Sequence, residues 1–194
     1  PEHREDRWIV SRLDRVTAEI TRSLENFELG DAQQKLYDFI WNDYCDWYIE
    51  MAKIRTRAGS EPSPLPTLAH VLERTLRLLH PFMPFITEEI WQTLTPILPK
   101  ENDFPESIMM APFPVAGDRL DVQAEEEIGL VMQAVRAVRN ARAQLRIPAG
   151  QHLEALVETN GQQATIEAEA DVIRTLSRVE PLRIVAGGAE SLNG

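Results

Sequence analysis

Apolar residues recur every three or four positions through the first third of the chain, as they do on one face of an amphipathic helix. A first helix is predicted from about Arg4 to Asn26, and its apolar positions are Trp8, Ile9, Leu13, Val16, Ile20 and Leu24. A second helix, from Asp31 to about Arg57, carries two apolar stripes. They are Leu36, Ile40, Trp47, Met51 and Ile54, and Tyr37, Trp41, Tyr44 and Tyr48. Because a helix that is apolar on two faces packs against neighbours on both sides, we expect the second helix at the centre of a bundle.

The link between these two helices, residues 27–30, reads Phe-Glu-Leu-Gly. We expect Gly30 to supply the special backbone geometry of the turn and Asp31 to cap the second helix. So short a link predicts that the two helices are antiparallel neighbours.

Prolines mark the next elements. Pro66 predicts the first residue of a third helix that reaches about His80, and Pro84 opens a fourth that ends near Leu94. Five prolines between residues 95 and 119 predict irregular backbone there.

The last third of the chain has a different pattern. A long helix is predicted over 121–145, an alternating strand over 152–158, a helix over 162–177 with a break near Asp171, and a short strand over 182–185 that ends at Gly187 and Gly188. The predicted fold is therefore mainly α. An antiparallel helical bundle occupies residues 1–118, and a long helix with a small α/β subdomain occupies 119–194.

Charge limits the possible functions. The 194 residues carry a formal net charge of −11, which argues against nucleic-acid binding when taken alone. Two stretches stand out, because residues 51–60 and 128–153 contain no acidic residue. The first holds Lys53, Arg55 and Arg57. The second holds Arg136, Arg139, Arg142 and Arg146, whose spacings of three and four place them along one side of a helix. These clusters are either solvated faces or contacts for a polyanion.

Several kinds of chemistry lack their sequence signals. The chain has no Gly-rich phosphate loop and no nucleophile elbow, and one cysteine with four scattered histidines does not make a zinc site. The single Cys45 allows no internal disulfide and favours an intracellular, cytoplasmic protein. We expect no catalytic residue, no metal and no cofactor in this chain.

Five segments carry a resemblance to a known family. They are Asp6–Leu13, Leu36–Lys53 with its Cys-Asp-Trp-Tyr core, Leu78–Trp91, Glu106–Met109 with Pro112-Phe-Pro114, and Arg139-Asn-x-Arg142 followed by Ile147-Pro148. In this order they resemble the anticodon-binding region of the class I aminoacyl-tRNA synthetases for valine, isoleucine and leucine, and the valine-specific members most closely. The resemblance covers about Arg4 to Pro148, and Ala149 replaces a second proline often found after Ile-Pro.

The resemblance implies a tRNA-binding part of a valine–tRNA ligase, which attaches valine to its tRNA with ATP and magnesium. It implies that the catalytic and editing domains and a C-terminal coiled-coil arm lie outside this chain, which alone would be inactive. The implied partners are a valine-accepting tRNA and the rest of the synthetase chain, with no membrane and a monomeric state. Two alternatives remain open: the same domain of an isoleucine or leucine enzyme, and a freestanding helical protein-interaction module, which the acidic charge favours.

Spacing also predicts where a binding site lies. Arg7 and Met51 each stand roughly 20 residues from the 27–30 turn, about 30 Å along their helices, so they share one end of the bundle. Trp8 and neighbouring cations would there form an aromatic platform flanked by positive charge, as an unpaired RNA base requires, unless Trp8 belongs to the core. The complete predicted tRNA-binding set is Arg7, Trp8, Arg12, Lys53, Arg55, Arg136, Arg139, Arg142 and Arg146.

Overall fold

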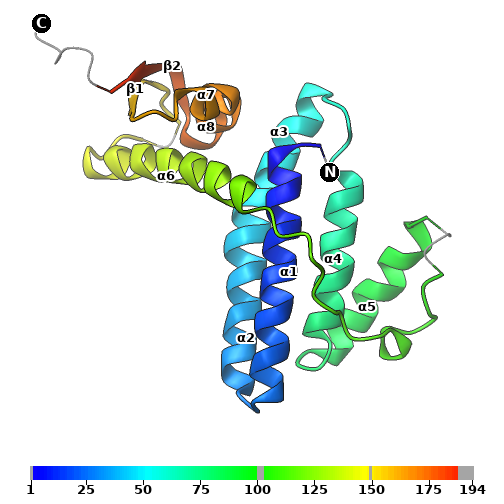
Figure 1. The fold of residues 1–194 in the computed structure, drawn as a ribbon. Helices are drawn as coiled ribbons and strands as arrows, with labels where there is room; N and C mark the ends of the chain where they lie inside the picture. The colour runs from blue at the N-terminus through cyan, green and yellow to red at the C-terminus, as the bar shows by residue number, and fades with distance from the viewer. Residues whose placement is uncertain (1, 100–102, 149, 188–194) are drawn as a thin grey trace, which may run out of the picture. The chain divides into compact units, whose positions relative to one another are not determined.

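The computed structural model describes residues 2–99, 103–148 and 150–187, which form two compact units (Figure 1). Unit 1 is Pro1–Val122 and unit 2 is Gln123–Gly194, so the boundary falls four residues later than the sequence pattern suggests. Ala149 and Gly188, which the sequence analysis singled out, lie outside the described residues.

Unit 1 begins with two long antiparallel helical segments, as predicted. The first is α1 (Arg4–Glu25). The second runs without interruption through α2 (Leu29–Asp38), a π-helix (Phe39–Tyr48) and α3 (Ile49–Ala58). Two further helices follow, α4 (Leu65–Leu79) and α5 (Pro84–Leu94), and α4 packs on both α1 and α5 (Figure 1).

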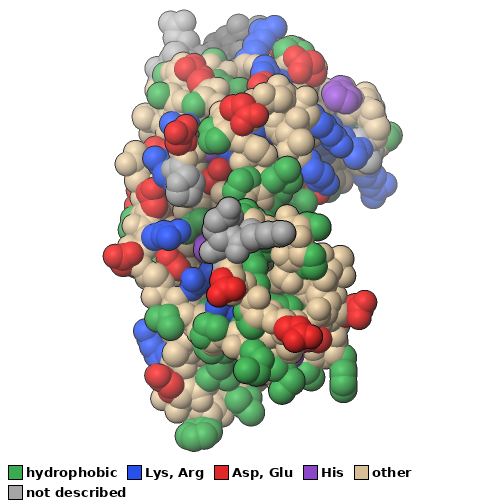
Figure 2. Space-filling view, turned by 90° about the vertical axis from the view of Figure 1, so that its right-hand side faces the viewer, with side chains coloured by type: hydrophobic (Ala, Val, Ile, Leu, Met, Phe, Trp, Pro, Cys, Tyr) green, Lys and Arg blue, Asp and Glu red, His purple; other side chains and the backbone are tan. Residues whose placement is uncertain are grey.

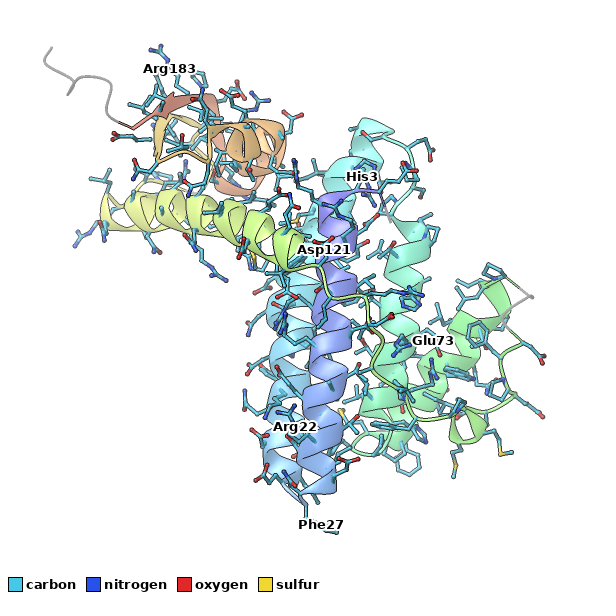
Figure 3. The ribbon with its side chains drawn as sticks, viewed as in Figure 1. His3, Arg22, Phe27, Glu73, Asp121 and Arg183 are labelled. Carbon is cyan, nitrogen blue, oxygen red and sulfur yellow. The ribbon has the colours of Figure 1, made fainter. Side chains whose placement is uncertain are left out.

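The turn between α1 and α2 differs from the expectation. Phe27, not Gly30, has the left-handed backbone, with φ of 61°, and its side chain projects from the tip of the hairpin (Figure 3). Gly30 lies inside α2. Asp31 does not cap the helix: it lies in the first turn, accepts a 2.5 Å hydrogen bond from Ser23 Oγ and pairs with Lys35. Asp31 therefore joins the two helices through side chains instead of satisfying backbone donors.

The second predicted stripe runs from α2 into the π-helix and is only half buried. Tyr44 and Tyr48 are buried, whereas Tyr37 and Trp41 are 58% and 52% exposed. A π-helix closes each hydrogen-bonded turn over five residues instead of four. Within this segment the stripe changes from exposed at Trp41 to buried at Tyr44, so the expectation that the whole stripe packs against neighbouring helices is wrong.

A small cluster of buried hydrophobic residues joins α4, α5 and the segment that follows them. Trp91 packs with Leu76 and Ile108, and its ring meets Phe104 edge-on at 5.6 Å. Short 3-10 turns occupy Thr95–Ile97 and Ile108–Met110.

The segment that leads out of unit 1 is tied to α1 by polar contacts. Asp14 accepts hydrogen bonds from the backbone N–H groups of Gly117 and Arg119, at 3.1 and 3.3 Å, and the N–H of Asp121 donates to Ser11 Oγ at 2.9 Å. A Cβ at position 117 would lie 2.6 Å from Asp14 Oδ2, so a side chain there would displace the Asp14 carboxylate.

Unit 2 contains α6 (Val122–Gln144) and a small βαβ unit. Strands β1 (Leu153–Thr159) and β2 (Val179–Ala186) pair in parallel, and α7 (Gln163–Ala168) and α8 (Ala170–Ser177) connect them. Parallel strands need such a crossover connection. The mainly α fold with a small α/β part is therefore confirmed. Within the described ranges, no helix is long and apolar enough to cross a membrane, and no group of three or more potential metal ligands is found.

Candidate nucleic-acid interface

The end of the bundle predicted from spacing does exist, and Arg55 is at its centre. Its guanidinium donates to Glu5 at 2.7 Å and to both carboxylate oxygens of Asp6 at 2.8 and 2.9 Å. Tyr48 OH donates to the same carboxylate at 2.6 Å. The start of α1 and the end of the second helical segment therefore share one end, as the residue count predicted.

The electrostatics at this end differ from the expectation. Arg55 is only 6% exposed, and two carboxylates neutralise it. Burial acts to lower the pKa of Arg55, but Asp6 and Glu5 more than offset it, so the guanidinium stays charged. Burial also raises the pKa of Tyr48, which therefore stays protonated and donates to Asp6. Arg55 is thus buried and paired with carboxylates in this structure, an arrangement that does not favour its predicted role as an RNA-contacting cation.

Trp8, the predicted aromatic platform, is also buried. Its side chain is 3% exposed, so the ring is not available as a stacking platform in this structure. The exposed aromatic pair of unit 1 is Tyr37 with Trp41, whose ring centres lie 6.1 Å apart. The sequence signal for this pair was its position four residues apart in a stripe that was expected to be core.

The other three predicted cations of unit 1 are part of surface ion pairs. Arg7 Nε lies 3.2 Å from Asp121, Arg12 Nε lies 2.9 Å from Asp43, and Lys53 Nζ lies 2.5 Å from Glu50. Ion pairs at this level of exposure contribute little to stability, so the cation can readily change its anionic partner. Each of these three cations can therefore bind a phosphate, but only after its contact with the carboxylate is broken.

Sequence reasoning missed another pair of arginines in unit 1. Arg74 donates to the carbonyl of Val115, and Arg77 donates to that of Pro112 at 2.9 Å. A groove of about 690 Å³ runs past them, and His70 also lines it. Burial lowers the pKa of His70, and the positive charge of Arg74 lowers it further. These arginines hold the 112–115 segment against α4. Over unit 1, Figure 2 shows acidic and basic side chains interspersed, and hydrophobic side chains gathered in its lower part.

In unit 2, the four predicted arginines separate into two kinds. Arg136 and Arg139 are exposed on α6, and Arg139 Nε donates to the carbonyl of Leu176 at 2.9 Å. Arg146 is also exposed but lies beyond the end of the helix. Arg142 is buried and its guanidinium donates to backbone carbonyls of the unit, an arrangement that does not favour the predicted phosphate contact.

Arg142 joins three backbone segments. It donates to the carbonyls of Arg178 at 3.0 Å, Pro148 at 3.0 Å and Gln151 at 2.6 Å. A carbonyl oxygen satisfies a donor without supplying a full negative charge, so these contacts order the loop but do not neutralise the guanidinium. Because residues 128–153 also contain no acid, this part of unit 2 keeps a positive bias.

Taken together, the bundle of unit 1 and the arginine-rich helix of unit 2 define a helical binding domain with a small α/β appendage. Comparison with known proteins places it: the chain belongs to the family of anticodon-binding domains of tRNA ligases, whose model matches residues 6–157.

Three relatives of this chain are all valine–tRNA ligases. The chain is 45% identical over 187 residues to the valine–tRNA ligase of Dehalococcoides mccartyi (strain CBDB1), and 94% of this chain aligns with 21% of that protein. The valine–tRNA ligase of Nostoc sp. is 40% identical over 94% of this chain and 18% of its own length. That of Thermotoga maritima is 39% identical over 93% of this chain and 20% of its own length. The chain thus spans about a fifth of the length of these relatives.

Proposed function

We propose that this chain is the anticodon-arm-binding region of a valine–tRNA ligase. The alignment of 94% of the chain with valine–tRNA ligases carries the proposal, together with the match of residues 6–157 to the anticodon-binding family. The antiparallel bundle and the arginine-rich α6 support it. A protein-interaction module, the alternative from another functional class, would not be expected to show this alignment.

In this proposal the complete protein attaches valine to its tRNA in the cytoplasm with ATP and magnesium. Regions of the relatives that this chain does not match would carry the catalysis and the hydrolytic editing. The partners of the chain are then a valine-accepting tRNA and the rest of the synthetase polypeptide, within a monomer. The chain itself positions the tRNA and performs no chemical step.

The contact residues that we propose are those whose cations can reach solvent. Arg136, Arg139 and Arg146 of unit 2 form the primary set, because they are exposed in a segment without acidic residues. Arg7, Arg12 and Lys53 form a secondary set, since each must exchange a carboxylate for a phosphate. Phosphate contacts of this kind orient an RNA, and base contacts then provide selectivity.

The test is the salt dependence of tRNA binding by the 194-residue chain. Each phosphate contact contributes roughly 0.7 to 0.9 to the slope of log affinity against log salt. Arg136→Ala with Arg139→Ala should therefore reduce the magnitude of the slope by about 1.4 to 1.8. Arg22→Ala, which removes an exposed arginine of α1 outside the proposed set, is the matched control and should leave the slope unchanged (Figure 3).

Two further measurements complete the test. The isolated chain should give only background ATP–pyrophosphate exchange with valine, and robust turnover would contradict the assignment of catalysis to other regions. Arg7→Ala with Lys53→Ala, placed in the complete enzyme, should slow charging of tRNA while helicity is retained. Wild-type charging together with wild-type rejection of anticodon variants would remove the secondary set from the proposal.

A further inference from the structure

The buried Arg142 lies in the last turn of α6, and both α6 and α8 are followed by an arginine with left-handed backbone. After α6, Arg146 has φ of 53°, and after α8, Arg178 has φ of 55°. At the end of α6 the N–H of Ile147 bonds the carbonyl of Arg142 at 3.0 Å, and that of Arg146 bonds Ala143 at 3.1 Å. This is the Schellman arrangement, in which the left-handed position is usually glycine because a Cβ is disfavoured there. Two arginines in such positions suggest that their side chains have a use.

Arg142 brings these two helix ends together. Its donors reach the carbonyls of Pro148, Gln151 and Arg178, so the backbone after α6 and the backbone after α8 meet at one guanidinium. His152 follows directly on Gln151. Both His152 and Arg178 are exposed and line the same cavity of about 360 Å³.

Two basic residues and one acidic residue line this cavity. Arg174 and Arg178 are the basic ones, and the guanidinium of Arg142 donates to the backbone carbonyl of Arg178 at 3.0 Å. The opposing carboxylates are Glu180, which also lines the cavity, and Asp171, which pairs with Arg174. Arg178 and His152 supply planar N–H donors at the opening, and such donors suit phosphate oxygens.

We propose that this cavity binds a phosphate of the RNA backbone, through Arg178 and His152, with Arg146 contacting the same strand at the neighbouring helix end. The inference rests on the proposed function for the identity of the ligand as RNA. It adds a contact in the βαβ part of unit 2 that neither the basic stretch of α6 nor the family resemblance assigns. Because its two arginines occupy positions that favour glycine, the site can be tested without damaging the fold.

The decisive variant is the double substitution Arg146→Gly with Arg178→Gly in the 194-residue chain. Glycine adopts positive φ without steric cost, so the melting temperature should stay the same or rise. Affinity for a valine-accepting tRNA transcript should fall about tenfold at fixed salt, since charge-assisted hydrogen bonds are lost. The salt slope should decrease in magnitude by roughly 1.4 to 1.8. Arginines that only terminated helices would not produce unchanged or raised stability together with weakened binding.

Phe27→Gly is the matched control, because Phe27 has φ of 61° in unit 1. It relieves the same backbone conformation and should leave affinity and slope at wild-type values. If the double glycine variant melts early, Arg178→Lys and Arg178→Gln are compared at a temperature where both are folded. Lysine should keep the salt slope and glutamine should lose about one contact from it.

The outcomes separate the two proposals. A wild-type chain that shows no salt-dependent tRNA binding would remove the proposed function. A wild-type chain that binds tRNA, with glycine variants of equal affinity and slope, would overturn the phosphate site alone and leave the proposed function standing.

Discussion

Arg55 in unit 1 and Arg142 in unit 2 are both buried but have acceptors of different charge, and the acceptor determines what each arginine can do. In unit 1, Arg55 binds the carboxylates of Glu5 and Asp6, and Arg12 binds that of Asp43. In unit 2, Arg142 binds three backbone carbonyls, and Arg139 donates to a fourth. A carboxylate cancels the charge of its partner, whereas a carbonyl satisfies the donors and leaves the charge in place. Counting arginines therefore says little about a binding surface until their acceptors are known.

The strongest test of this contrast is the buried carboxylate pair. Arg55→Ala would leave Asp6 buried without its cation, and breaking a buried pair in this way costs about 3–5 kcal/mol. Urea unfolding monitored on the bundle measures the loss. The control is Lys53→Ala, which removes a far more exposed ion pair and should change stability by less than about 1 kcal/mol. Equal losses for the two variants would contradict the view that burial makes the Arg55 cluster structural.

The second-largest loss of stability is expected when the contacts of Arg142 with three backbone carbonyls in unit 2 are removed. Arg142→Ala leaves three carbonyls without their donor, and we expect a loss of about 2–4 kcal/mol, confined to unit 2. Hydrogen exchange of the backbone N–H groups near residues 150–152 and 178 should accelerate, while α1 keeps its protection. Arg183→Ala, which removes an exposed residue paired with Glu154, is the comparison variant (Figure 3). Acceleration in α1 of the same size would mean that the effect is not local.

A smaller effect is expected from the hydroxyl that supports the Arg55 cluster. Tyr48→Phe removes the 2.6 Å hydrogen bond to Asp6 and should cost about 1–2 kcal/mol, because the acceptor is a buried carboxylate. Thermal unfolding measures it. The same substitution at the exposed Tyr37 should be nearly neutral, so a loss there as large as at Tyr48 would argue against the assigned acceptor.

The smallest expected effect is on the pH dependence of stability, through Glu88 of α5. Gln92, Ser107 and the N–H of Ile108 donate to Glu88 and hold its pKa below the ordinary value of 4.5. A lowered folded-state pKa contributes stability above about pH 4.5, and this contribution is lost as the pH falls through the folded-state value. Glu88→Gln should therefore flatten the decline in stability below pH 4.5. A decline as steep as that of the wild type would show that Glu88 does not contribute to it.

Local features of the sequence were enough to predict most of the fold. The bounds of α1, α4, α5 and α6 agree with the predicted bounds within two residues, because amphipathic periodicity and proline are local signals. The short link predicted that α1 and α2 are antiparallel, and the different pattern in the last third of the chain predicted a long helix with a small α/β part. The residue count along two helices also brought the start of α1 and Arg55 to one end.

Tertiary structure alone decided which of the nine predicted contact residues reach solvent. Arg55 finds Asp6 49 positions away, and Arg142 finds the carbonyl of Arg178 36 positions away. Neither acceptor is visible in a local pattern, since helical spacing fixes only the direction in which a side chain leaves its own helix. The structure likewise leaves Tyr37 and Trp41 exposed although they belong to a predicted apolar stripe. The sequence by itself determined the helices, their order and the family, whereas partners distant in the chain determined where the positive charge remains.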